Sequence, residues 1–506
     1  MSDQPFRPDR AGARPYRRRP MARIASFTGC LAAVIGTFVI AAPAQAAFVG
    51  AGPPPIHLPP PPPPPPPRVP ITTIPRFDPT FRANSNNVLG GSNNTNTSNP
   101  STAGGTTSSR KARTLARRTN TGNNNNGVPP SGERRYIPDQ VVFEVNGRLS
   151  DAQLAALLSR LRLTLIDTQR IGLINTTFYV ARITDGASVT TKIRALNATG
   201  RVRAAQPNYL FELVQTTAVA APAEAPDPSQ YALAKLHLDD AHNLTLGDNV
   251  LVAVIDSGID TAHPALTGIV QKSFDALHSS EGPANHGTAI AGIIAGHGHL
   301  SGAAPSVRIL AARAFGTTQG STTSILASLD WAIAEHARVV NMSFAGPSDP
   351  AFERTLAAAS QKGAVLVAAT GNAGPKSPPL WPAADPHVIG VTATDFDDHL
   401  FAMANRGRQV AIAAPGVDIL VARPGNGYKM ETGTSFSAAF VSGVAALMIQ
   451  RDPTLTPAAV EKVLLATAHD LGPKGRDEMF GAGLMDAFQA VNAVVKSTDA
   501  ALQLQH

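Results

Sequence analysis

The sequence predicts an α/β domain built on a doubly wound parallel sheet, with a small α+β domain and a long tail before it. From about residue 229, short runs of Val, Ile, Leu and Ala alternate with helical stretches, which is the pattern of such a sheet. Residues 133–214 alternate strands and helices on a smaller scale. Residues 47–132 are of low complexity, with long Pro-rich and Asn-rich stretches.

The main domain, residues 229–496, contains several runs that are apolar on both faces, as strands buried in a parallel sheet are. Helices are predicted between them, such as Ser324–His336 and Ala351–Lys362. Catalytic groups in sheets of this kind gather where the strands end. The predicted strands are Val250–Ile255, Arg308–Ala312, Val339–Met342, Ala364–Ala369, Val388–Val391 and Val410–Ala414.

The small domain, residues 133–214, has the order strand, helix, strand, helix, strand, which suits a ferredoxin-like sandwich. Its first helix begins at Ser150, an N-cap with Gln153 at the capping-box position. Its final strand, Val202–Leu213, is expected to be interrupted at Pro207. An Ala- and Pro-rich linker, residues 215–228, then leads to the main domain.

The N-terminus predicts export. Residues 1–46 contain a cluster of arginines, an apolar run from Cys30 to Ala42 and a small-residue cleavage site at Ala44–Ala46, which together are typical of a signal peptide. A secreted, periplasmic or cell-surface location follows. The alternative is an uncleaved signal segment, which would be the only attachment to a membrane. Cys30 is the single cysteine, so the processed chain would have no disulfide.

The segment between the signal and the small domain, residues 47–132, is predicted to be disordered. Pro59–Pro67 is unbroken proline, which forms a stiff extended rod. Asn84–Asn126 is rich in Asn, Ser, Thr and Gly and has few apolar side chains to offset the entropy of folding.

The charge distribution argues against a nucleic-acid partner. The chain has a net charge of +7, but residues 1–132 hold 15 Lys and Arg against 3 Asp and Glu. The remainder holds 28 basic against 33 acidic residues, so the folded part is mildly acidic and offers no basic binding face.

Three residues stand where a serine hydrolase needs them. Asp256 ends a predicted buried strand, and His286 and Ser435 each begin an apolar helix. In this chemistry the hydroxyl attacks, the imidazole takes its proton, and the carboxylate orients the imidazole. Each residue alone has a structural alternative, as a turn residue or a helix cap. All three in the order Asp, His, Ser favour the catalytic interpretation, because that is the order found in subtilisin.

Residues from about 229 to 492 resemble the subtilisin-like serine protease family. The segment Asn-Met-Ser-Phe-Ala-Gly resembles the family's substrate-binding strand, and Ala-Ala-Thr-Gly-Asn resembles its oxyanion segment. The resemblance implies a serine endopeptidase acting on polypeptides, with Asn372 as the side-chain donor to the oxyanion. It also implies substrate-binding roles for Ser343, Phe344, Ala345, Ala369, Thr370 and Gly371.

Residues 133–214 resemble the inhibitory propeptide of the same family, including Pro-Asn-Tyr near their end. This implies a secreted zymogen that processes itself, with its own propeptide as intramolecular inhibitor. The linker is then expected to lie across the cleft, and the first cut to fall between Phe211 and Tyr231.

The sequence departs from the family pattern in three places. Ala289 replaces a second histidine, and Phe436–Ala439 replaces Met-Ala-Ser-Pro after the nucleophile. The segment between Ala291 and Ala304 is short where many members carry a calcium-binding loop. No cofactor and no metal-ligating residues are therefore predicted, although weak structural calcium binding elsewhere stays open.

Two other functions remain open from the sequence alone. A catalytically silent relative could act as a surface-binding module on the Pro- and Asn-rich stalk, but it would be free to lose members of the triad. An esterase could use the same triad.

Because the expected pocket walls carry no charged residue and Leu380 is expected at the pocket base, small or medium apolar residues are predicted before the cut bond.

Overall fold

The computed structural model describes residues 127–494 except 146, 148, 215–229 and 280. All described residues belong to one compact unit. The predicted signal peptide, nearly all of the predicted tail and the linker lie outside the described residues. None of the helices in the described part of the chain is both long and apolar enough to span a bilayer.

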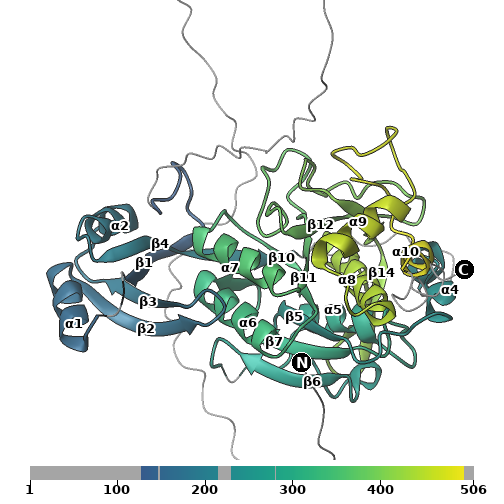
Figure 1. The fold of residues 1–506 in the computed structure, drawn as a ribbon, viewed down its shortest axis with the longest axis horizontal. Helices are drawn as coiled ribbons and strands as arrows, with labels where there is room; N and C mark the ends of the chain where they lie inside the picture. The colour runs from purple at the N-terminus through teal and green to yellow at the C-terminus, as the bar shows by residue number, and fades with distance from the viewer. Residues whose placement is uncertain (1–126, 146, 148, 215–229, 280, 495–506) are drawn as a thin grey trace, which may run out of the picture. The chain divides into compact units, whose positions relative to one another are not determined.

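The main sheet has seven strands, and each pair of neighbours is parallel (Figure 1). All six predicted strands are present; β9 has the predicted bounds, and no end of the others is shifted by more than three residues. The seventh, β6, was missed because it is an edge strand with little buried surface. In spatial order the strands are β13 (Ile412–Pro415), β12 (Val388–Thr394), β11 (Val365–Ala369), β9 (Val339–Met342), β5 (Leu251–Asp256), β7 (Arg308–Arg313) and β6 (Val270–Asp275).

Helices cover both faces of this sheet. On one face lie α5 (Asn285–Ala295) and α8 (Thr434–Arg451). On the other lie α6 (Thr322–Ala334) and α7 (Pro350–Gln361). Every residue of α8 from Thr434 to Ile449 is buried, which explains its small and apolar composition. The remaining elements are α3 (Tyr231–Lys235), α4 (Leu238–His242), the 3-10 turn η1 (Pro264–Leu266), α9 (Pro457–Thr467), α10 (Ala487–Asn492) and the hairpin of β14 (Ile419–Arg423) with β15 (Gly427–Glu431).

The small domain is a four-stranded antiparallel sheet in the order β4-β1-β3-β2 with two helices. Both halves of the capping box at Ser150 and Gln153 are formed. The elements are β1 (Tyr136–Val145), α1 (Asp151–Arg160), β2 (Leu163–Ile171), β3 (Thr176–Ile183), α2 (Val189–Asn197) and β4 (Val202–Leu213).

Two predictions for this domain were wrong. β2 was missed, because most of its residues between Leu163 and Ile171 are exposed and its sequence lacks apolar alternation. Pro207 does not interrupt β4, where it lies opposite Val141 of β1. The register of β1 shifts between Tyr136 and Val141, and such irregular places accommodate a residue without an N–H group.

The two domains share one extended sheet. The last residues of β4 pair antiparallel with two short strands of the main domain, β8 (Gln319–Ser321) and β10 (Phe344–Ala345). Phe211 of β4 is fully buried there, edge-on to the rings of Phe344 and Phe352 at 6.0 and 5.5 Å. The sheet of the small domain and helices α6 and α7 thus contribute to one continuous core.

Polar contacts surround this shared core. Glu144 of β1 is buried and receives the guanidinium of Arg354 from α7 at 2.6 Å. Asp330 of α6 accepts the backbone N–H groups of Gly172 and Leu173 at 3.0 and 2.6 Å. Because each ion pair or hydrogen bond joins one domain to the other, together they fix their relative orientation.

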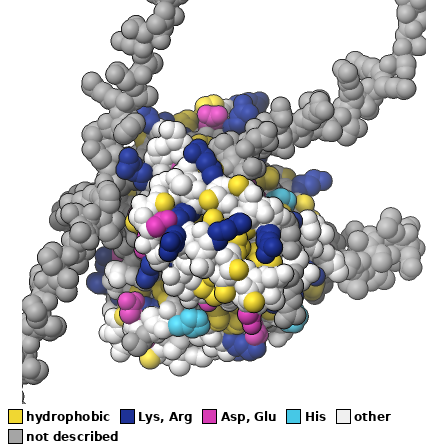
Figure 2. Space-filling view, turned by 90° about the vertical axis from the view of Figure 1, so that its left-hand side faces the viewer, with side chains coloured by type: hydrophobic (Ala, Val, Ile, Leu, Met, Phe, Trp, Pro, Cys, Tyr) yellow, Lys and Arg dark blue, Asp and Glu magenta, His cyan; other side chains and the backbone are white. Residues whose placement is uncertain are grey.

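The charges of the two domains are complementary. Residues 133–214 hold 11 Lys and Arg against 7 Asp and Glu, whereas residues 229–496 hold 17 against 23. Figure 2 shows the side of the molecule that carries α1 and α2, where Lys and Arg side chains outnumber Asp and Glu. The opposite net charges favour association of the domains.

Candidate active site

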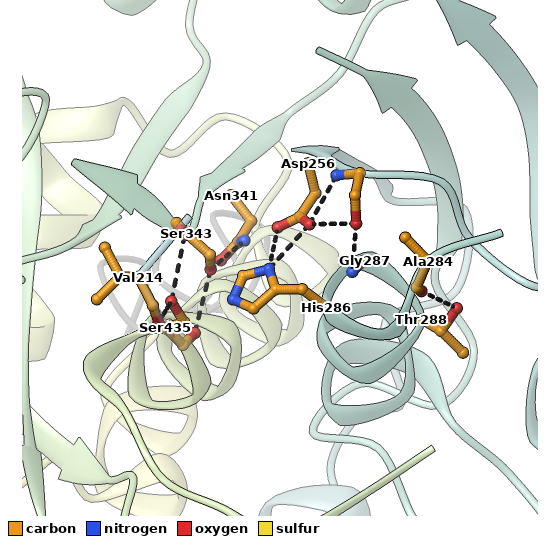
Figure 3. Close-up of polar contacts among 10 residues, drawn as sticks. Val214, Asp256, Ala284, His286, Gly287, Thr288, Asn341, Ser343 and Ser435 are labelled. Carbon is orange, nitrogen blue, oxygen red and sulfur yellow. Dashed lines mark hydrogen bonds and ion pairs between the residues drawn. The ribbon is translucent and has the colours of Figure 1, made fainter. Parts of the chain in front are cut away.

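Asp256 and His286 are brought together by the end of β5 and the start of α5 (Figure 3). Nδ1 of His286 lies 2.9 Å from both carboxylate oxygens of Asp256, and both side chains are almost completely buried. Nδ1–H donates to the carboxylate, which leaves Nε2 as the proton acceptor of the neutral ring. Nε2 is buried and has no hydrogen-bond partner among the described residues.

Ser257 links the carboxylate to the histidine helix. Its backbone N–H and its hydroxyl both donate to Oδ1 of Asp256, at 2.7 and 3.1 Å, and its hydroxyl accepts the N–H of Gly287 at 3.0 Å. A Cβ on Gly287 would lie 2.7 Å from the carbonyl oxygen of Ser257, so this close approach requires glycine.

Ser435 lies in the first turn of α8 and is fully buried. The backbone N–H groups of a helix N-terminus face this position, and the helix dipole favours negative charge there. The ring of Phe436, the next residue, lies 6.1 Å from that of His286 and helps to enclose the imidazole. The segment that departs from the family pattern therefore leaves the predicted nucleophile at the start of the helix.

The end of the small domain lies against Ser435, as the position of Val214 in Figure 3 shows. The N–H of Val214 donates to the carbonyl of Ser343 at 3.2 Å. The hydroxyl of Ser435 donates to the carbonyl oxygen of Val214 at 2.8 Å, and to that of Ser343 at 3.2 Å. A peptide carbonyl therefore lies against the hydroxyl of the predicted nucleophile.

The predicted substrate-binding residues lie in two segments, here called rims, at the ends of the neighbouring strands β9 and β11. Ser343, Phe344 and Ala345 follow β9, and the last two form β10, which pairs with Leu213 and Glu212 of β4. The second rim ends β11 and continues into the loop after it, and its residues are buried: Ala369, Thr370 and Gly371.

Asn372 follows this second rim and is held against the start of α8. Its Oδ1 accepts the N–H and the hydroxyl of Thr434, at 3.1 and 2.9 Å, so the amide presents Nδ2 on its other side. A Cβ on Gly433 would lie 2.8 Å from that Nδ2 and 3.3 Å from the Val214 carbonyl oxygen. Gly433 has an extended backbone, so glycine is needed there for space between these groups.

Asn405 is a buried residue of the site that sequence reasoning missed. Its Nδ2 donates to the carbonyl of Thr370, and its Oδ1 accepts the N–H of Ala373, both at 2.9 Å. It therefore fixes both ends of the loop that carries Asn372. Gly371 has a φ of 109°, and a Cβ there would lie 2.4 Å from Nδ2 of Asn405. That asparagine lies in a loop without apolar pattern, so the sequence offered no signal for it.

The segment after α5 is short and tightly closed. The N–H of Gly302 donates to the carbonyl of Gly296 at 2.8 Å, and Ala303 and Ala304 bond back to α5. Within the described residues no group of three or more His, Cys, Asp or Glu side chains is arranged to hold a metal ion.

Comparisons with known proteins agree with this fold. The subtilase family model matches residues 247–483, and the model of the fervidolysin N-terminal prodomain matches residues 122–208. A thermophilic serine proteinase from Bacillus sp. (strain AK1) is 33% identical over 329 residues, which cover 62% of this chain and 78% of that protein. Subtilisin Savinase from Lederbergia lenta is 34% identical over 264 residues, 51% of this chain and 96% of that protein.

A solved structure shows the same architecture. Fervidolysin from Fervidobacterium pennivorans, described as a keratinolytic enzyme related to subtilisin, superimposes with a TM-score of 0.61 at 24% identity. The match covers 72% of this chain but only 62% of fervidolysin. On the evidence of its relatives and of the two matching models, the chain belongs to the subtilase family, as a subtilisin-like serine endopeptidase with a prodomain-like region before its peptidase domain.

Proposed function

We propose that the protein hydrolyses peptide bonds through Asp256, His286 and Ser435, with Asn372 stabilising the oxyanion, and that it is made as an exported zymogen that cuts itself. The observation that carries this proposal is the Val214 carbonyl lying 2.8 Å from the Ser435 hydroxyl. Export is supported by the sequence of residues 1–46 and by an extracellular relative, the minor extracellular protease Epr of Bacillus subtilis, 33% identical over 270 residues.

The chemistry follows from these positions. The hydroxyl of Ser435 now donates to the Val214 carbonyl, so the side chain must turn toward Nε2 of His286 before attack. Nε2 then takes the proton as Oγ bonds to the carbonyl carbon, and Asp256 stabilises the imidazolium. The oxyanion is stabilised by Nδ2 of Asn372 and by the start of α8. When the C–N bond breaks, His286 returns the proton to the leaving amine, and water then hydrolyses the acyl-enzyme.

The prodomain acts in this proposal as the first substrate and then as an inhibitor. Phe211 to Val214 add a strand to the rim of the cleft, which is a common way to bind an extended peptide. The bond that follows Val214 is the one presented to Ser435. Gln215, on its other side, lies outside the described residues. The first cut is expected between Phe211 and Tyr231, and we propose the bond after Val214 within that range.

Replacing the nucleophile tests the triad. Ser435→Ala should abolish peptide hydrolysis, self-cleavage and labelling by a fluorophosphonate, with a loss on the order of 10⁶-fold, as in the related subtilisin. Asn372→Ala should lower kcat by roughly 10²–10³-fold, again the size seen in subtilisin. Hydrolysis by Ser435→Ala within about tenfold of wild type would refute the triad, and an unchanged kcat in Asn372→Ala would assign the oxyanion to other groups.

Mass spectrometry of the released fragment tests the site of self-cleavage. The released N-terminal fragment should end at Val214, and the first cut should not depend on protein concentration because it is intramolecular. The freed fragment should inhibit the enzyme.

Arg354→Ala should weaken that inhibition by about tenfold, because Glu144 loses its main charged partner. Arg408→Ala, an exposed arginine of the same domain, serves as the control. A fully active enzyme with a mature N-terminus before Arg134 and no inhibition by the fragment would contradict the prodomain role.

Specificity should follow the strand that occupies the cleft. Val214 is 6% exposed, which supports small or medium apolar residues before the cut bond, and buried Phe211 supports an aromatic residue three positions earlier. A Cβ on Gly346 would lie 2.3 Å from Cδ1 of Phe211. In a peptide-library screen, Gly346→Ala should therefore shift the preference at the position of Phe211 toward smaller residues and leave the preference at the position of Val214 unchanged. Dominance of Arg or Lys before the cut bond would refute the apolar pocket, since a charge buried there has no partner.

Stability without calcium is the remaining proposal. A high-affinity calcium loop needs six to eight oxygen ligands, and the tight segment from Gly296 to Gly302 offers little room for them. The melting temperature and activity should therefore change little in a chelator. A collapse of the melting temperature after chelation, restored by added calcium, would show that a required site lies elsewhere.

A further inference from the structure

Three fully buried polar side chains form a hydrogen-bonded row that ends at the nucleophile. Ser442, two turns after Ser435 on α8, donates its hydroxyl to Oδ1 of Asn341 at 3.0 Å. Nδ2 of Asn341 donates to the hydroxyl oxygen of Ser343 at 2.8 Å. That hydroxyl donates in turn to the backbone carbonyl of Ser435 at 3.1 Å, and Figure 3 shows this last part of the row.

Ser343 is the point where this row meets the substrate strand. Its hydroxyl bonds to the backbone of Ser435, while its carbonyl accepts the N–H of Val214 and the hydroxyl of Ser435. A displacement of Ser343 therefore moves the nucleophile and the peptide relative to each other. Displacements of about 1 Å in such a site are enough to cost about two orders of magnitude in rate.

The side-chain amide of Asn341 is held by two hydrogen bonds, one to Ser343 and one from Ser442. The amide of Asn341 lies on β9 and is fully buried, so water does not replace a lost partner. Among the described residues, Ser442 is the donor recorded for Oδ1. The single hydroxyl proton of Ser442 is shared between Oδ1 of Asn341 at 3.0 Å and the carbonyl of Ala438 on its own helix at 2.8 Å, and this second contact fixes the side-chain rotamer. Without that hydroxyl, Asn341 is held through Ser343 alone.

We propose that Ser442 is a positioning residue, which acts through Asn341 and Ser343 to hold the nucleophile and the substrate strand in register. This inference rests on the proposed function of Ser435. No step of the reaction passes through Ser442, since it is separated from the reacting atoms by two side chains.

The test compares Ser442→Ala with a matched buried serine in the processed enzyme. Ser442→Ala should lower kcat by about tenfold with KM within about twofold, and should slow fluorophosphonate labelling of Ser435 as well. Ser328→Ala removes a buried hydroxyl from α6 that has no partner among the described residues, so kcat should be unchanged. In a cycle with Asn341→Ala, the double variant should lose little more than Asn341→Ala alone, because both changes break one row.

The outcomes separate this inference from the proposed function. If Ser442→Ala melts lower but keeps the wild-type kcat and labelling rate, Ser442 is only structural and the inference is overturned. If losses in the cycle with Asn341→Ala simply add, it is overturned too. Residual activity in Ser435→Ala would instead refute the proposed function itself. Should Ser442→Ala fail to fold, Ser442→Cys keeps a weak donor of similar size, and its kcat should be reduced; a wild-type kcat would again overturn the inference.

Discussion

The placement of Phe211–Val214 between β8 and β10 is the constraint on which the relation of the two domains depends. A shift by one residue along a strand moves each carbonyl by about 3.3 Å and turns each side chain to the opposite face. Phe211 prevents such a shift, because its ring packs edge-on against the rings of both Phe344 and Phe352. The aromatic contact thus sets which carbonyl faces Ser435, although it lies three residues away from it.

The site itself depends on the order of the main sheet. Asp256 ends β5, Asn341 and Ser343 lie at the end of β9, and Asn372 follows β11. These three strands are neighbours in the sheet, so their ends meet at one edge. Helix α8 packs across the same strands and brings Ser435 to that edge from far along the chain. The site residues therefore meet because the strands that carry them are parallel neighbours, and long loops are not needed to bring them together.

Much of this could be predicted from the sequence, and the exceptions share a cause. Asp256, His286 and Ser435 stand at strand ends and helix starts, where a buried apolar pattern on one side makes a polar residue conspicuous. β2 and β6 are edge strands with little buried surface, so they lack that pattern. Asn405 and Ser442 make hydrogen bonds to residues distant in sequence, and a serine in a helix of small residues gives no signal of such a contact. The register between the domains, as at Val214, is set by packing and by backbone hydrogen bonds between segments distant in sequence.

The contacts that bind the end of the small domain are separate from the bond that is proposed to be cut. Within the part of the chain that the structure describes, the contacts that hold the prodomain strand in place run from Phe211 to the N–H of Val214 and lie before the bond that follows Val214. Glu144 and the turn at Gly172 add further contacts farther from the cleft. None of these contacts is lost when that bond is cut. In the proposed self-cleavage the strand would keep these contacts, and release of the peptidase domain would then proceed through unfolding or digestion of the prodomain, which its own core and the shared core both oppose.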